Sequence, residues 1–230
     1  MKISDSTQLI VVYMLILFSL VLSSISTPHS NGEVPYINNK FMDTVHDVNG
    51  KVVAFIGDSH TSYSKGWQDI LSKKTGLKYF NYSVGGISTN WMLDIAKNNL
   101  NSYHNFLFVW GGANDMFGNY ITPKQALNNV QEIVNLANKR KIKTFILTGF
   151  SPKDCVENKN QKTEQYIKRY SEYQQLLVDS IKGATVIKNH FVNKNDGDCG
   201  DYICHMTYQG HTKMADSIIS TLKLKLVDNQ

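Results

Sequence analysis

The chain has 230 residues, of which 42% are hydrophobic and 19% are charged. This composition excludes a disordered chain and suits one domain with a full core. The net charge of +5 comes from scattered lysines, and the densest basic cluster, residues 139–141, lies where a helix is expected to end. Cations at that position favour the helix dipole, so the charge predicts no nucleic-acid-binding surface.

Residues 1–26 are predicted to form a secretory signal peptide. The run Leu9–Leu22 is apolar and follows a short polar start that contains Lys2, and residues 24–26 fit the small-x-small cleavage pattern. The apolar run is at or below the length of a membrane span, so cleavage is preferred over an uncleaved anchor. We therefore expect a secreted or extracytoplasmic protein. The alternative is a membrane-anchored protein that faces the extracytoplasmic side.

Residues 27–50 are polar and irregular, and we expect a linker there, followed by one domain over residues 51–230. Within this domain, short apolar runs alternate with longer stretches of helical periodicity. Strands are expected at 52–56, 77–82, 105–110, 143–148 and 185–188, and helices at 64–74, 89–98, 122–139, 160–182 and 207–226. This alternation is typical of a parallel sheet with helices on both faces. The predicted fold class is therefore α/β, a three-layer α/β/α sandwich with a parallel sheet of about five strands.

The first predicted strand ends at Gly57-Asp58-Ser59. A serine in this place is held rigidly at the carboxyl edge of the sheet, where such folds bind ligands. The glycine allows a sharp turn and leaves room for a substrate to approach. The alternative is an ordinary turn in which Asp58 or Ser59 caps the next helix. Other features at the same edge decide between the two.

Polar and glycine-rich clusters also follow the second and third predicted strands. Gly85 and Gly86 follow the second strand, Asn114 follows the third, and His205 precedes the last helix. A histidine can accept the proton of a serine hydroxyl, and N–H donors can stabilise the oxyanion that forms during acyl transfer. Together with Ser59, these residues predict acyl-transfer chemistry.

At these places the sequence resembles the SGNH (GDSL-like) hydrolase superfamily of serine esterases, lipases and acetylesterases. The family's four blocks are matched by Gly57-Asp58-Ser59, by Asn81 to Gly86, by Gly112-Ala113-Asn114-Asp115, and by His205 with Gly210. The resemblance implies a flavodoxin-like SGNH hydrolase fold, with Ser59 as nucleophile and His205 as general base and then general acid. It also implies an oxyanion hole made of the Ser59 and Gly86 N–H groups and the Asn114 side chain. The enzymes that this sequence resembles use no metal and no organic cofactor.

One position departs from the family pattern. The family has an aspartate three residues before the histidine, and here that residue is Tyr202. Asp201, four residues before His205, could reach the imidazole through a one-residue bulge and is the expected third catalytic residue. Asp198 is a less favoured substitute. If neither reaches, Ser59 and His205 act as a dyad and turnover falls.

Three cysteines, Cys155, Cys199 and Cys204, all lie in loop-like sequence. An oxidising compartment favours one disulfide and one remaining thiol, and all three pairings stay open. The cysteines lack the paired spacing of a zinc site, so we expect no metal.

Several other polar residues are expected to be structural. Asp58 is expected to cap a helix or brace the turn, and Asp115 to brace a loop. His60 is expected to be exposed and incidental, and His211 to be a surface or capping residue. Asn81 opens a formal glycosylation sequon but is expected to be buried and unmodified. Tyr166, Tyr170 and Tyr173 are expected to form a stripe on the fourth helix that faces the core and its rim.

The sequence therefore predicts a secreted serine esterase that hydrolyses carboxylic esters through an acyl-enzyme. With no long lid-like insertion, it favours a small acyl group or an exposed ester, as in acetylated carbohydrate or a lysophospholipid. The expected partners are small-molecule, glycan or lipid esters, and a membrane only through an uncleaved N-terminal segment. Two alternatives stay open. One is a polysaccharide O-acyltransferase of the same fold, and the other is a catalytically weakened binding protein that retains the scaffold.

Overall fold

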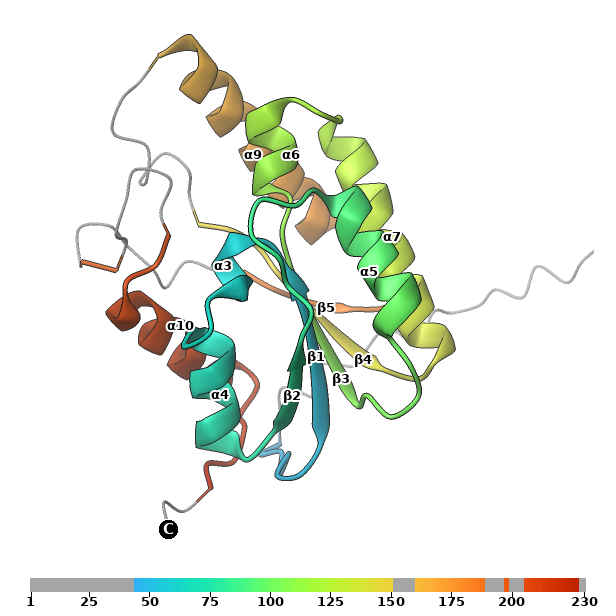
Figure 1. Cartoon of the computed structure of the whole chain (residues 1–230), viewed down its shortest axis with the longest axis vertical. Coiled ribbons are helices and arrows are strands. Elements are labelled where there is room, and N and C mark those ends of the chain that lie inside the picture. Colours follow the sequence, from blue (N-terminus) through green and yellow to red (C-terminus); the bar gives the residue numbers. More distant parts are fainter. Residues whose placement is uncertain (1–43, 151–159, 189–196, 199–204, 228–230) are drawn as a thin grey trace, which may run out of the picture. The chain divides into compact units, whose positions relative to one another are not determined.

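Five parallel strands form the central sheet, in the order β2-β1-β3-β4-β5 (Figure 1). The structure, a computed structural model, describes residues 44–150, 160–188, 197–198 and 205–227. The strands are β1 (Val52–Gly57), β2 (Lys78–Asn81), β3 (Phe106–Trp110), β4 (Lys143–Leu147) and β5 (Thr185–Ile187). The predicted α/β class and its parallel sheet are confirmed. The strand order reverses direction between β1 and β3, and such folds bind ligands beyond the carboxyl ends of the strands at this point.

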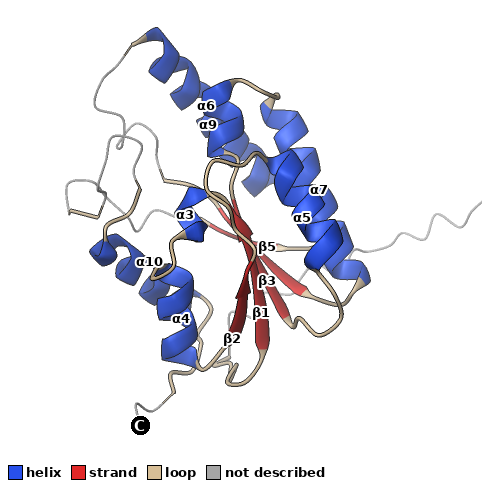
Figure 2. Ribbon diagram, viewed as in Figure 1, coloured by secondary structure: helices blue, strands red, loops and turns tan. Residues whose placement is uncertain are grey.

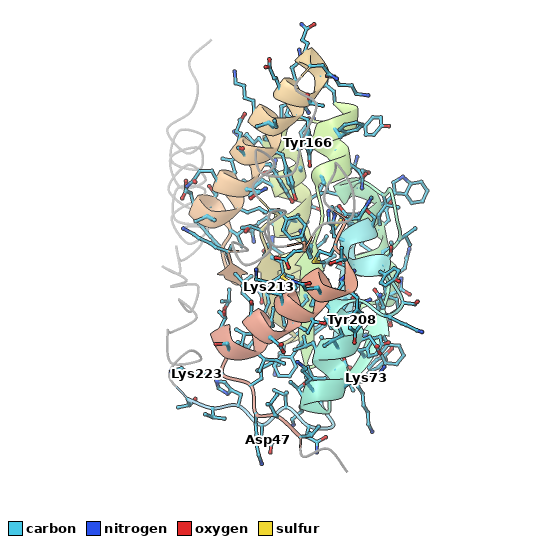
Figure 3. The ribbon with its side chains drawn as sticks, turned by 90° about the vertical axis from the view of Figure 1, so that its left-hand side faces the viewer. Asp47, Lys73, Tyr166, Tyr208, Lys213 and Lys223 are labelled. Atoms are coloured by element: carbon cyan, nitrogen blue, oxygen red, sulfur yellow. The ribbon has the colours of Figure 1, made fainter. Side chains whose placement is uncertain are left out.

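Helices cover both faces of the sheet (Figure 2). On one face, α4 (Trp67–Thr75) packs beside α10 (Tyr208–Thr221), as Figure 3 shows. On the other face lie α5 (Thr89–Asn99), α7 (Pro123–Lys139) and α9 (Gln161–Ser180). The domain is therefore the three-layer sandwich that the sequence predicts.

Each face of the sheet has its own hydrophobic core because successive side chains of a strand point to opposite sides. In β1, Val53 and Phe55 belong to the core under α4 and α10. Ala54 and Ile56 belong to the core under α5, α7 and α9. This two-sided burial explains why the strand is a continuous apolar run rather than an alternating one.

The predicted helix starts at Thr122 and Asn160 are confirmed by their caps. The Thr122 hydroxyl accepts the Gln125 N–H, and the Gln125 side chain accepts the Thr122 N–H in return. Asn160 and Thr163 form the same reciprocal pair at α9. Such capping boxes satisfy N–H groups that a helix leaves without an internal acceptor.

Two short helices were not expected from the sequence, α3 (Ser59–Ser62) and α6 (Ala113–Gly118). Each is too short to produce a recognisable helical period of apolar residues. Both begin at the carboxyl end of a strand, and each carries a residue of the predicted site. They therefore matter more for the site than their length suggests.

The segment that precedes β1 contacts the domain instead of behaving as a free linker. The N–H of His46 donates to the Lys223 carbonyl at 2.9 Å, and the N–H of Lys225 donates to the His46 carbonyl at 2.8 Å. Val48 is buried in the core under α4 and α10. The predicted last helix also ends earlier, at Thr221, because the following residues form this extended contact.

Within the described ranges, no helix combines the length and the apolar character needed to cross a membrane. The predicted signal peptide, residues 1–26, lies outside these ranges, so secretion stays a prediction.

Candidate active site

The turn after β1 presents Ser59 as the first residue of α3. Asp58 is the N-cap, as predicted, and its Oδ1 accepts the His60 N–H at 3.1 Å. The Asp58 N–H donates to the Trp110 carbonyl at 3.2 Å, which ties the turn to the end of β3. A Cβ on Gly57 would lie 2.4 Å from that same carbonyl oxygen. A side chain at this position would therefore clash with the end of β3, and glycine avoids the clash.

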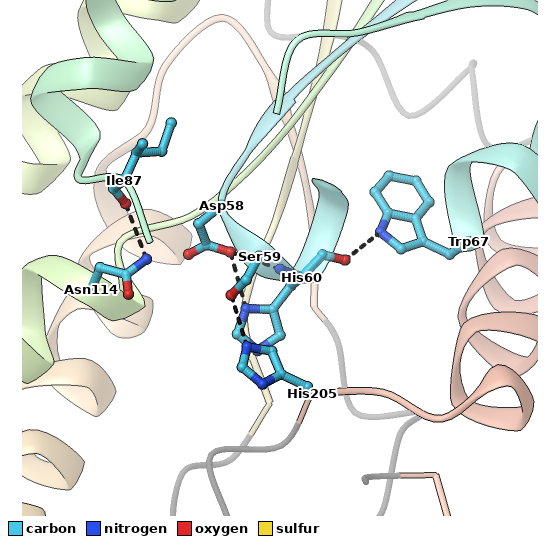
Figure 4. A network of polar contacts seen from close by, with 7 residues as sticks. All are labelled: Asp58, Ser59, His60, Trp67, Ile87, Asn114 and His205. Atoms are coloured by element: carbon cyan, nitrogen blue, oxygen red, sulfur yellow. Dashed lines mark hydrogen bonds and ion pairs between the residues drawn. The ribbon is translucent and has the colours of Figure 1, made fainter. Parts of the chain in front are cut away.

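The Ser59 hydroxyl contacts the His205 imidazole. Ser59 Oγ lies 2.9 Å from His205 Nε2, although the residues are 146 positions apart in the sequence (Figure 4). This is hydrogen-bond distance, and it brings together a hydroxyl and a base.

The chain on both sides of the His205 loop is anchored at the start of α10. The Thr207 N–H donates to the Asp198 carbonyl at 2.8 Å, and the Thr207 hydroxyl donates to the Gly197 carbonyl at 2.9 Å. Thr207 also caps α10 by accepting the Gly210 N–H. Because His205 is two residues from this anchor, its backbone is held near the end of β1.

Asp198 is fully buried and pairs with Lys213 of α10 at 2.8 Å. One of its carboxylate oxygens is thus committed to an ion pair that holds the base of the loop. Asp198 therefore anchors the segment that precedes His205, and its role as a substitute for Asp201 stays a prediction.

The glycine-rich loop after β2 lies beside Ser59. The Val84 N–H donates to the Gly57 carbonyl at 3.0 Å, so this loop continues the pairing of β1 with β2. A Cβ on Gly85 would lie 3.9 Å from the Ser59 Cβ. Gly86 has a φ of +78°, a conformation that favours glycine. The loop therefore brings its backbone close to the serine, as predicted from the two glycines.

Asn114, in the first turn of α6, lies to the left of Ser59 in the view of Figure 4, and His205 lies below Ser59. Its side-chain Nδ2 donates to the Ile87 carbonyl at 3.1 Å. An amide nitrogen carries two N–H donors, so this bond orients the group and leaves a second donor.

Asp115 ties the two loops together, which confirms its predicted role as a brace. Its carboxylate accepts the Thr89 N–H at 2.9 Å and the Thr89 hydroxyl at 3.1 Å. Burial raises the pKa of Asp115, and the bonds from Thr89 oppose that rise. The Asp115–Thr89 and Asn114–Ile87 contacts fix α6 against the start of α5. The positions of Asn114 and Gly86 are thereby coupled.

The expectation that His60 is exposed is wrong. His60 is only 7% exposed, and its Nδ1 lies 3.0 Å from Asp58 Oδ1. The α3 turn points Ser59 toward His205 and directs the next side chain inward, against Trp110. Neighbouring residues of a helix face different directions, and α3 is too short for the sequence to have revealed this.

The expectation that His211 lies on the surface is also wrong. His211 is 4% exposed, and its Nδ1 accepts the N–H of Trp67 at 3.2 Å, at the start of α4. Burial lowers the pKa of His211 to about 4, with a smaller contribution from His60. The spacing of His211 from the buried Met214 and Ala215 is helical, and this pattern could have placed it on the inner face of α10.

The Asn81 side chain is partly buried, and its nitrogen donates to the Thr61 carbonyl at 2.9 Å, so the amide of the formal sequon is engaged in a hydrogen bond.

The three tyrosines of α9 face the core, as predicted. The ring of Tyr170 stacks between those of Tyr166 and Tyr173.

Other predicted residues lie outside the described part of the chain. These are Asp201 and the three cysteines, Cys155, Cys199 and Cys204. Among the described residues, no group of three or more His, Cys, Asp or Glu side chains could hold a metal ion.

The family model of the GDSL-like lipases and acylhydrolases matches residues 53–218. The chain belongs to this family. The match runs from β1 to α10 and includes every residue of the site described above. The GDSL-like family comprises lipases and acylhydrolases, which places the chain among the carboxylic ester hydrolases. No curated protein sequence matches the chain.

Several solved structures share the fold of this chain. The acetylxylan esterase Axe2 from Geobacillus stearothermophilus has a TM-score of 0.61 at 12% identity, covering 80% of this chain and all of that one. LAE5, an α/β hydrolase from the metagenome of Lake Arreo in Spain, has a TM-score of 0.62 at 12% identity, covering 79% and 97%. A G-D-S-L family lipolytic protein from Veillonella parvula has a TM-score of 0.56 at 15% identity, covering 74% and 96%. At these identities the likeness shows a common fold.

Proposed function

We propose that this GDSL-family protein hydrolyses carboxylic esters through an acyl-enzyme formed on Ser59. The observation that carries the proposal is the 2.9 Å contact between Ser59 Oγ and His205 Nε2. A serine hydroxyl is a weak nucleophile until a neighbouring base accepts its proton, and His205 is in position to do so.

In the proposed reaction, Ser59 Oγ attacks the ester carbonyl carbon and its proton passes to His205 Nε2. The carbonyl π electrons move to oxygen and form a tetrahedral oxyanion. When the oxyanion collapses, the bond to the alcohol oxygen breaks, and His205 donates the proton to that oxygen. Water then attacks the acyl-enzyme in the same way, with His205 as base, and releases the acid and the free serine.

The oxyanion is proposed to bind three donors, the N–H groups of Ser59 and Gly86 and the side-chain amide of Asn114. Ser59 begins a helix, so its N–H has no acceptor within that helix. Asn114 is held by the Ile87 carbonyl and keeps a second amide hydrogen. Each such donor contributes about 3–4 kcal/mol to the stability of the transition state.

Asp201 is proposed as the carboxylate that orients His205. The proposal rests on its position in the sequence, four residues before the histidine. The solved structures of Axe2 include catalytic mutants in which a serine, an aspartate or a histidine is replaced by alanine. A carboxylate on the second imidazole nitrogen would fix the tautomer that leaves Nε2 free to accept a proton.

We propose small acyl esters as substrates, with acetylated carbohydrate favoured over a lysophospholipid. The support is the fold shared with an acetylxylan esterase. We further propose that the protein acts outside the cytoplasm, on the basis of the apolar N-terminal segment Leu9–Leu22.

The test is the hydrolysis of p-nitrophenyl acetate and butyrate by the wild-type protein and by Ser59→Ala and His205→Ala variants. We expect both variants to lose at least about 10³-fold in kcat, since either substitution disables the same unit. A Ser59→Ala variant that hydrolyses these esters at the wild-type rate would overturn the proposal.

A further inference from the structure

His60 is a buried histidine placed directly after Ser59, and its ring meets three other rings. It stacks on Trp110, with ring centroids 5.1 Å apart, and meets Phe150 edge-on at 5.5 Å. The third ring is His205, whose centroid lies 5.4 Å from that of His60 with a tilt of 37° (Figure 4). One surface of the His205 imidazole thus rests against His60, while its Nε2 faces Ser59.

Asp58 fixes the orientation of His60. The His60 Nδ1 lies 3.0 Å from Asp58 Oδ1, and the same oxygen accepts the His60 backbone N–H. An ionised carboxylate only accepts hydrogen bonds, so Asp58 in that form favours the tautomer of His60 that carries a proton on Nδ1. The Asp58 side chain is fully buried. Its charge is therefore screened by water much less than a surface charge would be.

The backbone of His60 is held as firmly as its ring. The His60 carbonyl accepts the indole N–H of Trp67 at 3.2 Å, which links α3 to α4. The ring therefore cannot turn away without breaking contacts on three sides, with Asp58, Trp110 and Phe150. A rigid support of this kind keeps a neighbouring group within the narrow limits that catalysis requires.

The support also has an electrostatic consequence. In the proposed reaction His205 takes up the serine proton and becomes a cation. A cation is favoured over the face of an aromatic ring and near a buried negative charge. His60 presents its ring to His205, and its Nδ1 proton connects it to the Asp58 carboxylate.

We propose that His60, held by Asp58, is a positioning residue for His205. The pair holds the His205 ring over Ser59 and stabilises its protonated form during turnover. This inference rests on the proposed function. It adds to the site a second carboxylate–histidine pair, Asp58 and His60, which does not involve Asp201.

Three variants separate packing from charge. His60→Phe keeps a flat ring but loses the bond to Asp58. Asp58→Asn keeps an oxygen acceptor and an equally good helix cap but removes the charge. The third is the double variant. We expect kcat for p-nitrophenyl acetate to fall about 10- to 100-fold in each single variant, with KM changed less than about twofold. The double variant should be no slower than His60→Phe alone, because the two residues act as a unit.

The matched control is His104→Phe. His104 is also buried and bonded to its neighbours, but it lies at the amino end of β3, at the opposite edge of the sheet. This variant should keep the wild-type kcat even if its melting temperature falls. Wild-type kcat in folded His60→Phe and Asp58→Asn, or losses that multiply in the double variant, would overturn the inference. Activity that survives in Ser59→Ala would instead overturn the proposed function, so the two failures can be told apart.

Discussion

Ser59 owes its position to the two residues that precede it. Gly57 lets β1 approach the Trp110 carbonyl, and Asp58 caps the single turn of α3 that follows. The hydroxyl therefore projects from a rigid strand end toward His205. Catalytic groups held in this way lose little entropy when the substrate binds.

Replacing Asn114 tests its proposed role in the oxyanion hole. Asn114→Ala removes a proposed oxyanion donor, so we expect kcat to fall about 10²- to 10³-fold while KM changes little. The measurement is steady-state hydrolysis of p-nitrophenyl acetate. Asn138→Ala is the control, because Asn138 also donates its side-chain amide to a carbonyl, that of Gly183, far along the chain from the site. Equal kcat in the Asn114→Ala and wild-type proteins would remove Asn114 from the oxyanion hole.

The helices hold the site together through a few polar contacts between their ends. Asp115 of α6 binds Thr89 at the start of α5, and Thr207 joins the start of α10 to residues 197–198. His211 of α10 accepts the first N–H of α4. These contacts link elements far apart in the sequence, so the site depends on helix ends more than on helix bodies.

His211 makes the stability of the protein depend on pH. Its folded pKa of about 4 lies below the usual value of 6.5, because burial disfavours the charged ring. Between these values the unfolded chain binds a proton that the folded protein does not, so stability falls as the pH drops from about 6.5 to 4. From pH 7 to pH 5 this group alone should remove about 2 kcal/mol.

Urea unfolding at pH 7 and pH 5 measures this effect. His211→Asn retains an acceptor for the Trp67 N–H but does not titrate. The wild-type protein should lose about 2 kcal/mol more than this variant between the two pH values. An equal loss in both proteins would mean that His211 titrates normally in the folded state.

At the scale of the whole molecule, the domain includes residues that precede the first strand. His46 pairs with the chain that follows α10, and Val48 is buried below α4 and α10. The ends of the described domain thus brace each other at the edge of the sheet opposite to Ser59. The boundary at residue 51, predicted from composition, leaves out this contact.

A truncation series tests this boundary. The domain in a chain that begins at residue 44 should have the same free energy of unfolding as in the full-length protein. One that begins at residue 51 should be less stable by about 2–4 kcal/mol, from the loss of one buried valine and of the backbone hydrogen bonds made by His46, Val48 and Gly50. Thermal and urea unfolding give these values. Identical stability of the two chains would show that the His46 and Val48 contacts add nothing.

The sequence predicted the architecture well, because the signals for it are local. Apolar runs marked all five strands, and Thr122 followed by Pro123 marked the start of a helix. Ser59, Gly86, Asn114 and His205 each followed or preceded such an element, so the sheet topology was enough to bring them to one edge.

The features that the sequence did not predict depend on tertiary packing. Nothing in a single histidine distinguishes an exposed ring from one enclosed by Trp110 and Phe150, and this is why His60 was misjudged. The helical spacing of His211 from Met214 and Ala215 was a signal of its burial, but its hydrogen-bond partner, a backbone N–H 144 residues away, had none. The contact of His46 with the end of the chain has no local signal at all.

The most direct test of the central claim is covalent labelling of the nucleophile. The full-length protein is treated with a fluorophosphonate, and the modified residue is identified by peptide mass spectrometry. We predict one phosphonylated residue, Ser59, with no labelling in Ser59→Ala and slow labelling in His205→Ala, since His205 activates the hydroxyl at 2.9 Å. Labelling of a different residue, or ester hydrolysis in a protein whose Ser59 never reacts, would contradict the account.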